Sequence, residues 1–183
     1  DVDVDHVEAE IKKLFGPMKN PANASPVVTE NVPDNNTPIV IIDKDKEQTS
    51  TIVQMMMKRD ATPDSVKGDV NYLVYEYVKG VGIGLLNDRL AEAALKPDCP
   101  FVGASASVES YIFAKTKEAF SIAVSPKTTE LTADALRAAY TEALRAAQFG
   151  FTKTEYDRSK SSTLSSLDRM YSNRDKRFTS QFA

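Results

Sequence analysis

The residues that could carry out chemistry are few and far apart. His6 is the single histidine and Cys99 the single cysteine among 183 residues. A catalytic zinc usually needs two or three imidazoles, so His6 alone cannot form such a site. We interpret His6 as a solvated surface histidine, with a metal or catalytic role as the alternative. Cys99 lies beside Pro100 and Phe101 with no base near it in sequence, which favours a structural side chain over a reactive thiol.

Two short patterns are compatible with ligand binding but have simpler explanations. We interpret the alternating Asp1, Asp3 and Asp5 as a strand end running into a helix cap, with a hard-cation site as the alternative. KGVGIG at 79–84 lacks both the GxGxxG span and the Lys-Ser/Thr of a phosphate loop. We interpret Met55 to Met57 as strand residues and not as a docking surface. The residues therefore predict no catalytic residue and no metal site in this chain.

Composition narrows the possible partners. The net charge of −3 comes without a basic stripe, so we expect no nucleic-acid binding. No apolar run approaches the roughly 20 residues that a membrane-spanning helix needs. The acidic start and the charged helical end (SNRDKRFTSQFA) look like cuts in a longer polypeptide. We therefore expect residues 1–183 to form a single domain excised from a longer chain.

The first half of the chain predicts two helices and a hairpin. Asp5 predicts the cap of a helix that ends at Gly16, and a long surface connection follows to Thr37. Residues 38–43 and 49–58 predict the two strands of a hairpin. Thr62 predicts the cap of a long helix reaching about Leu95. Three glycines within this helix predict a bend or close helix packing: Gly80, Gly82 and Gly84.

The second half predicts strands and then helices. Apolar and small residues at 101–108, 111–114 and 119–124 predict a meander of two or three antiparallel strands. Thr132 predicts the cap of a helix over 133–148 that stops at Gly150. A capping box formed by Thr152 and Glu155 opens the final helix. Its predicted apolar face carries Leu164, Leu167, Tyr171 and Phe178. Together these elements predict an α+β fold: a two-layer sandwich of a mostly antiparallel sheet with helices packed on one face.

Five segments, taken in order, resemble the second domain of a pitrilysin/insulin-degrading-enzyme half. They are DVDVDHVEAEIKKLFG, IVIIDKDKEQTSTIVQ, GIGLLNDRLAEAAL, PDCPFVGASASVES and ALRAAQFGFTKTEYDRSKSSTLSSL. The resemblance covers nearly the whole chain and is closest to the large bacterial envelope members. The glycine that precedes the first motif in the family is missing here. The substrate-binding Arg and Tyr of the other half are also missing, because Ala94 or Leu95 and Phe101 stand at their positions. These differences fit a second domain.

The resemblance implies a parent enzyme that is a zinc metallopeptidase. Its zinc motif HxxEH would lie in the missing first domain, where a glutamate activates a zinc-bound water. The cofactor implied for the parent is thus zinc, with none in this chain. The implied partners are the preceding zinc-binding domain and a peptide substrate. A location in the bacterial envelope or periplasm is implied for the parent protein.

The resemblance implies that this domain packs against the zinc domain and helps to enclose the peptide. The candidate substrate-facing residues are Glu47, Gln48, Phe101, Ser105 and Ser107, with inter-strand packing as the alternative role. A second interpretation is a non-peptidase scaffold, or an inactive partner subunit of the same fold. A third is an unrelated α+β binding domain.

Overall fold

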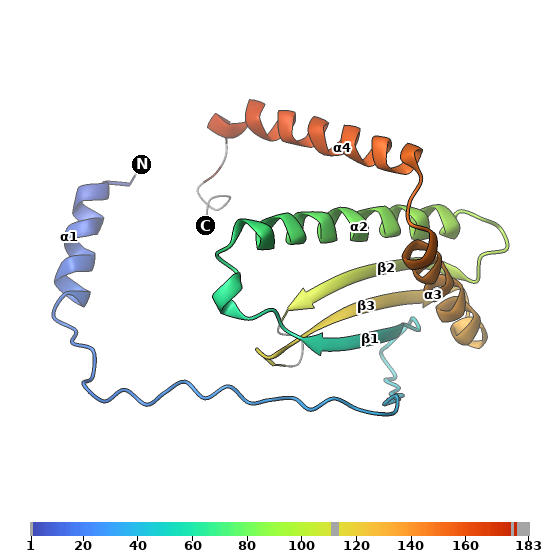
Figure 1. Cartoon of the computed structure of the whole chain (residues 1–183), viewed down its shortest axis with the longest axis horizontal. Helices are drawn as coiled ribbons and strands as arrows, with labels where there is room; N and C mark the ends of the chain where they lie inside the picture. Colours follow the sequence, from blue (N-terminus) through green and yellow to red (C-terminus); the bar gives the residue numbers. More distant parts are fainter. Residues whose placement is uncertain (1, 111–113, 177, 179–183) are drawn as a thin grey trace.

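The computed structural model describes residues 2–110, 114–176 and 178. The chain folds into helices around a small sheet (Figure 1). The helices and strands, in chain order, are α1 (Val4–Phe15), β1 (Val53–Asp60), α2 (Val70–Ala94), β2 (Phe101–Ser110), β3 (Lys117–Pro126), α3 (Thr132–Phe149) and α4 (Lys153–Ser172). None of the helices in this part of the chain is long and apolar enough to cross a membrane.

The sheet is antiparallel, with the strand order β1-β3-β2. Ile122 on the central strand lies opposite Met55 on β1 and Ala106 on β2. Because side chains alternate along a strand, Ile122 and Val124 point to one face and Ser121 points to the other. The first face carries the apolar core, and the second carries small and polar residues.

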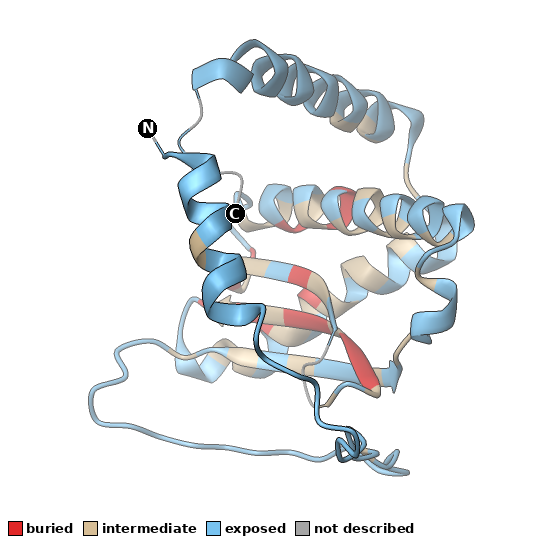
Figure 2. Cartoon of the chain, turned by 90° about the vertical axis from the view of Figure 1, so that its left-hand side faces the viewer, coloured by how far each residue is buried: buried red, intermediate tan, exposed pale blue. Residues whose placement is uncertain are grey.

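The core lies between that first face and two helices. Its buried helix and strand residues come from α2, α3, β2 and β3 (Figure 2). They are Leu86, Leu90, Phe101, Ala106, Ile122, Val124, Ala135 and Ala139. The alanines of α3 let that helix approach the sheet closely. The predicted α+β fold with an antiparallel sheet is thus confirmed.

The other two helices lie away from the sheet. No residue of α1 or α4 is buried, and Figure 1 shows α1 apart from the sheet and α4 running beyond α2. The expectation that the helices pack on one face therefore holds for α2 and α3 only. The predicted apolar face of the last helix is exposed, with Leu164 at 51% and Leu167 at 53%.

Helix starts differ from those predicted where another carboxylate reaches the first turn. Asp3, not Asp5, caps α1, because its Oδ1 accepts the His6 backbone N–H. Asp69, not Thr62, caps α2, since a 3₁₀ turn at Asp64–Val66 separates Thr62 from the helix. The capping box of Thr152 and Glu155 is present as predicted. Gly150, at φ +69°, ends α3 as predicted.

Three other expectations differ from the structure. Residues 38–43 are extended but unpaired, and β1 pairs with β3, so the predicted hairpin is not formed. Helix α2 runs without interruption through its three glycines. A Cβ atom added at Gly80, Gly82 or Gly84 would meet nothing within 4 Å, so no neighbouring helix packs closely there. The expected strand at 111–114 falls largely outside the described residues.

Candidate functional site

The sheet face opposite the core is the candidate contact surface, and we call it the open face. Its position follows from the strand register, because directly opposed residues share a face. The open face consists of Gln54, Met56 and Lys58 on β1, Ala119, Ser121 and Ala123 on β3, and Ser105, Ser107 and Glu109 on β2. Small side chains occupy β3 and most of β2 on this face, and longer ones line β1.

Two of the predicted substrate-facing residues lie on this face. Ser105 is exposed, and Ser107 is half-buried with its Oγ donating to Glu109 Oε1 at 2.8 Å. Phe101 lies on the core side of the same strand with only 1% of its surface exposed. The structure thus brings the two serines together, and it gives the Phe101 ring the packing role that was the alternative interpretation.

Glu47 and Gln48 lie in the turn that precedes β1, remote in sequence from both serines. The turn is closed by Asp45, whose carbonyl accepts the Gln48 N–H at 3.3 Å and whose Oδ1 accepts the Glu47 N–H at 2.7 Å. Gln48 Nε2 donates to the Ser50 carbonyl at 3.0 Å. Both side chains are exposed. Because they precede β1, we assign them to the β1 side of the sheet and the two serines to the β2 side.

Ser121 lies at the centre of the open face and was missed by sequence reasoning. It is opposite Ser107 on one side and Met56 on the other. Its exposure is 1%, and its Oγ has no hydrogen-bond partner among the described residues. The alternation of Ala119, Ser121 and Ala123 with apolar residues was the available signal, because it marks the face away from the core.

At the charged end of the open face, Lys117 forms ion pairs with Asp60 and Asp34. Its Nζ lies 2.6 Å from Asp60 Oδ1 and 2.9 Å from Asp34 Oδ1, and only 3% of its side chain is exposed. The hydrogen bonds to Asp60 and Asp34 raise the pKa of Lys117, and the same contact lowers the pKa of Asp34. Lys117 therefore joins the ends of two strands to the segment that precedes them.

The open face could contact another polypeptide, but its described side chains form neither a metal site nor a nucleophile–base pair. Among the described residues, no group of three or more His, Cys, Asp or Glu side chains could hold a metal ion. His6 is exposed on the separate helix α1, and Cys99 is buried as a member of the core. The Ser107 hydroxyl meets a carboxylate but no imidazole, so a nucleophile–histidine pair is not present there. Such a surface can lie against an extended chain.

A second feature joins α4 to α2. Arg89 Nε is 2.5 Å from Glu155 Oε1, and its NH2 donates to Glu155 Oε2 at 2.9 Å and to the Gly150 carbonyl at 3.0 Å. Its guanidinium also lies 4.6 Å from the centre of the Phe151 ring. Arg89, followed by the Thr152 backbone N–H, holds the pKa of Glu155 well below its ordinary value. The capping box was evident from sequence, but its partner Arg89 was not.

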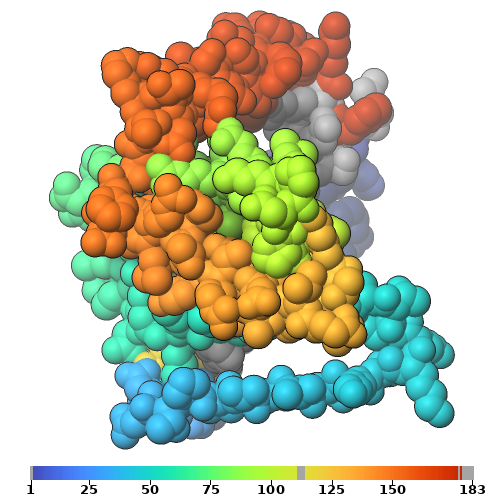
Figure 3. All heavy atoms as spheres, turned by 90° about the vertical axis from the view of Figure 1, so that its right-hand side faces the viewer, coloured from blue at the N-terminus to red at the C-terminus, as the bar shows by residue number. Residues whose placement is uncertain are grey.

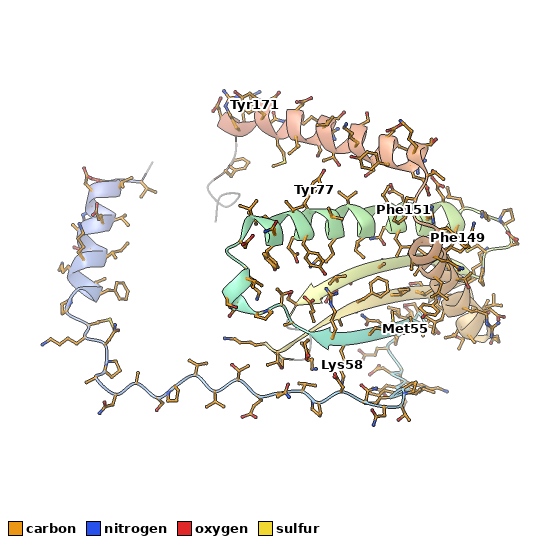
Figure 4. All side chains as sticks on the ribbon, viewed as in Figure 1. Met55, Lys58, Tyr77, Phe149, Phe151 and Tyr171 are labelled. Atoms are coloured by element: carbon orange, nitrogen blue, oxygen red, sulfur yellow. The ribbon has the colours of Figure 1, made fainter. Side chains whose placement is uncertain are left out.

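Beyond this junction, α2 and α4 border an open groove of about 320 Å³. Its lining residues are Glu76, Tyr77, Gly80, Val81, Gly84, Ser159 and Thr163. Figure 4 shows Tyr77 on the side of α2 that faces α4, and Tyr171 near the far end of α4. Both rings are largely exposed, at 65% and 69%. Large exposed apolar surfaces of this kind mark contacts with other protein.

Comparison with known proteins shows a shared fold. The sequence matches no protein-family model and none of the curated proteins. A solved structure from Yersinia pestis, described as a predicted insulinase family protease, matches with a TM-score of 0.75 and 15% identity over 99% of this chain and 38% of that chain. The periplasmic protease PqqL from Escherichia coli matches with a TM-score of 0.66 and 18% identity, over 100% of this chain and 19% of that one.

A structure of the first half of PqqL gives a similar result. Its TM-score is 0.67 at 19% identity, and the match covers 99% of this chain and 37% of that chain. The chain thus spans less than two-fifths of the length of each of these protease chains. Its structural neighbours are insulinase-family and PqqL-type proteases, and the likeness concerns the fold.

Proposed function

We propose that this chain is a non-catalytic domain of a zinc-dependent endopeptidase, and that it helps to enclose peptide substrate. The observation that carries the proposal is the coverage of the structural matches. Nearly all of this chain overlays on protease chains that are at least two and a half times longer. The zinc, held by an HxxEH motif, would belong to a preceding domain of the same polypeptide.

Exposed apolar side chains support a partner domain. Val7, Ile11 and Leu14 form a stripe on α1 with exposures of 42–63%. On α2, Leu73 and Val78 are also largely exposed, at 62% and 61%. Uncovered stripes on amphipathic helices are unfavourable in water. We propose that these faces meet the rest of the polypeptide.

The open face is the proposed substrate side. Ser105 and Ser107 add no bulk, so an extended peptide can approach the strand backbone closely there. Glu47 and Gln48 would contribute from the β1 side. Phe101 supports the strand from beneath. The proposed location of the parent protein is the periplasm, which the PqqL match supports.

The test of the substrate role uses the full-length polypeptide that contains this chain. Ser107→Arg places a long cation on the open face and is expected to raise KM for long peptides with little change in kcat. Gln148→Arg, on the exposed side of α3, is the matched control. Equal kinetics for the two variants would remove the open face from substrate binding. A full-length protein without peptidase activity would favour the scaffold interpretation instead.

A further inference from the structure

The outer edge of β1 offers unpaired backbone groups. The Ala61 N–H donates to the Thr116 carbonyl at 2.9 Å. This bond shows which alternate residues of β1 form hydrogen bonds with β3. In an antiparallel pair, alternate residues bond across the ladder. Residues 53, 55, 57 and 59 therefore face β3, and Gln54, Met56 and Lys58 direct their N–H and C=O groups outward. The part of the chain that the structure describes provides no backbone partner for them.

The opposite edge of the sheet is occupied at its centre. Asn87 on α2 receives the Ala106 N–H at 2.7 Å and donates to the Ala106 carbonyl at 3.0 Å. The side-chain amide thus takes the place of a neighbouring strand on β2. A strand that joins this sheet would meet the least obstruction at β1.

A segment of the same chain runs along β1, and we call residues 30–48 the strap. Its first end is fixed to the sheet by three contacts. The Glu30 carbonyl accepts from Thr116 Oγ1 at 3.3 Å, the Pro33 carbonyl from Lys58 Nζ at 2.5 Å, and Asp34 pairs with Lys117. Figure 4 shows Lys58 on the strap side of β1. The second end is fixed by the turn at Asp45–Gln48, which residues 49–52 connect to β1.

Between these ends the strap lies away from the sheet. Figure 1 shows it passing beneath β1, and Figure 3 shows an open space between it and the body of the molecule. This middle part holds Ile39, Val40, Ile41 and Ile42, whose exposures are 72–85%. These β-branched residues are the side chains that favour strands. An apolar strand former thus lies beside a free strand edge.

We propose that the strap closes on the β1 edge as a fourth strand, so that residues 39–42 pair with residues 51–54, which are the start of β1 and the two residues before it. The hydrogen-bonded turn at Asp45–Gln48 sets the register, which places residue 44 opposite residue 49. Ile41 then lies opposite Ile52, and Val40 lies opposite Val53. Pro38 falls opposite Met55, where its nitrogen points away from β1 and needs no hydrogen bond.

Closure removes apolar surface from water on both faces of the sheet. Val40 and Ile42 join Val53, which already packs against the core, and Ile41 covers Ile52, which is 61% exposed in the open arrangement. The short connection of residues 43–52 keeps the segment at a high effective concentration near the edge. This tether favours the chain's own strand over a second copy of the chain or a peptide.

Disulfide trapping tests the register. In a Cys99→Ala background, Val40→Cys with Val53→Cys should form an intramolecular disulfide under mild oxidation, because non-hydrogen-bonded pairs bring Cα atoms to about 4.5 Å. Ile41→Cys with Val53→Cys is the matched control, since those side chains point to opposite faces. Equal rates in the two variants, or a disulfide formed only between chains, would overturn the proposal. Mass spectrometry distinguishes these products.

Amide exchange in the unmodified chain gives an independent readout. The Gln54 and Met56 amides should exchange slowly, and Ile41→Pro should raise their rates about tenfold, equivalent to about 1.4 kcal/mol. Val40→Pro should not, because the Val40 N–H points away from β1 in this register. A synthetic peptide of residues 37–43 is the probe for a vacant edge. If these amides exchange fast until that peptide is added, the edge takes external strands and the proposal is wrong.

Discussion

The side chain of Asn87 forms two hydrogen bonds with the backbone of Ala106, one from each polar group of that residue. These bonds, at 2.7 and 3.0 Å, join the middle of α2 to the outer edge of β2. A helix that only packed on the sheet would leave the Ala106 N–H and C=O without partners. Helix α2 therefore contributes both to the core and to the completion of the sheet.

Replacing this amide should be costly. Asn87→Ala leaves two partly buried backbone groups unpaired, and we expect the free energy of unfolding to fall by about 1–3 kcal/mol. Asp88→Ala, at the exposed neighbouring position, should change it by less than about 0.5 kcal/mol. Urea unfolding of both variants provides the measurement. Equal stability of the two would show that the edge contact contributes nothing.

The junction between Arg89 and Glu155 predicts a pH dependence. The pKa of Glu155 is lowered in the folded chain, so the unfolded chain binds more protons as pH falls. The contribution of Glu155 is fully present above its unfolded pKa of about 4.3 and is lost as pH falls through the lower folded value. Glu155→Gln should therefore be less stable than wild type by about 1–3 kcal/mol at pH 7. This difference should shrink below about pH 4.

A matched control separates this junction from ordinary surface charge. Asp157, two residues after Glu155 on α4, forms an exposed pair with Lys153. Asp157→Asn should cost less than about 0.5 kcal/mol at any pH. Thermal melts from pH 3 to 7 would compare the variants. A difference between wild type and Glu155→Gln that grows towards low pH would contradict the sign of the pKa shift.

Phe101 tests the core. Phe101→Ala should lower the free energy of unfolding by about 3–5 kcal/mol, because the buried ring leaves a cavity between α2, α3 and the sheet. Val102→Ala alters the adjacent residue, which is 64% exposed, and should have a small effect. Denaturant titration compares the two. A negligible cost at Phe101 would return that ring to the list of substrate-facing residues.

Replacing Ser121 should not lower the free energy of unfolding, in contrast to replacing Phe101. Its buried hydroxyl lacks a partner among the described residues, so Ser121→Ala removes an unsatisfied polar group. We expect the stability to stay constant or to rise by up to about 1 kcal/mol. Ser107→Ala removes a hydroxyl that is already bonded to Glu109 and is the comparison. A clear loss of stability in Ser121→Ala would mean that this hydroxyl is hydrogen-bonded in solution.

Local signals in the sequence predicted the elements better than their partners. The capping box of Thr152 and the stop at Gly150 depend on neighbouring residues, and both are present. The strand of residues 101–108 was evident from its small and apolar residues. By contrast, Arg89 and Glu155 are 66 positions apart in the sequence. A local sequence pattern cannot predict a contact between residues so far apart.

The site was predicted in part for the same reason. Ser105 and Ser107 were selected from one strand, and the structure places both on the open face. Ser121 joins them only through the pairing of β2 with β3, which the sequence does not reveal. Phe101 has the same spacing as Ser105 and Ser107, but a register shift between Phe101 and Gly103 turns its ring to the core side. The apolar run at 38–43 has strand composition, but composition does not say when a strand pairs.

The most direct test compares the 183-residue chain with the longer polypeptide that we propose contains it. Zinc content by elemental analysis and cleavage of a long unfolded peptide would be measured for both, with and without a chelator. We expect the longer polypeptide to hold zinc and to cleave the peptide in a chelator-sensitive manner, and the isolated chain to do neither. One tightly bound zinc per isolated chain, or chelator-sensitive cleavage by it, would contradict the account.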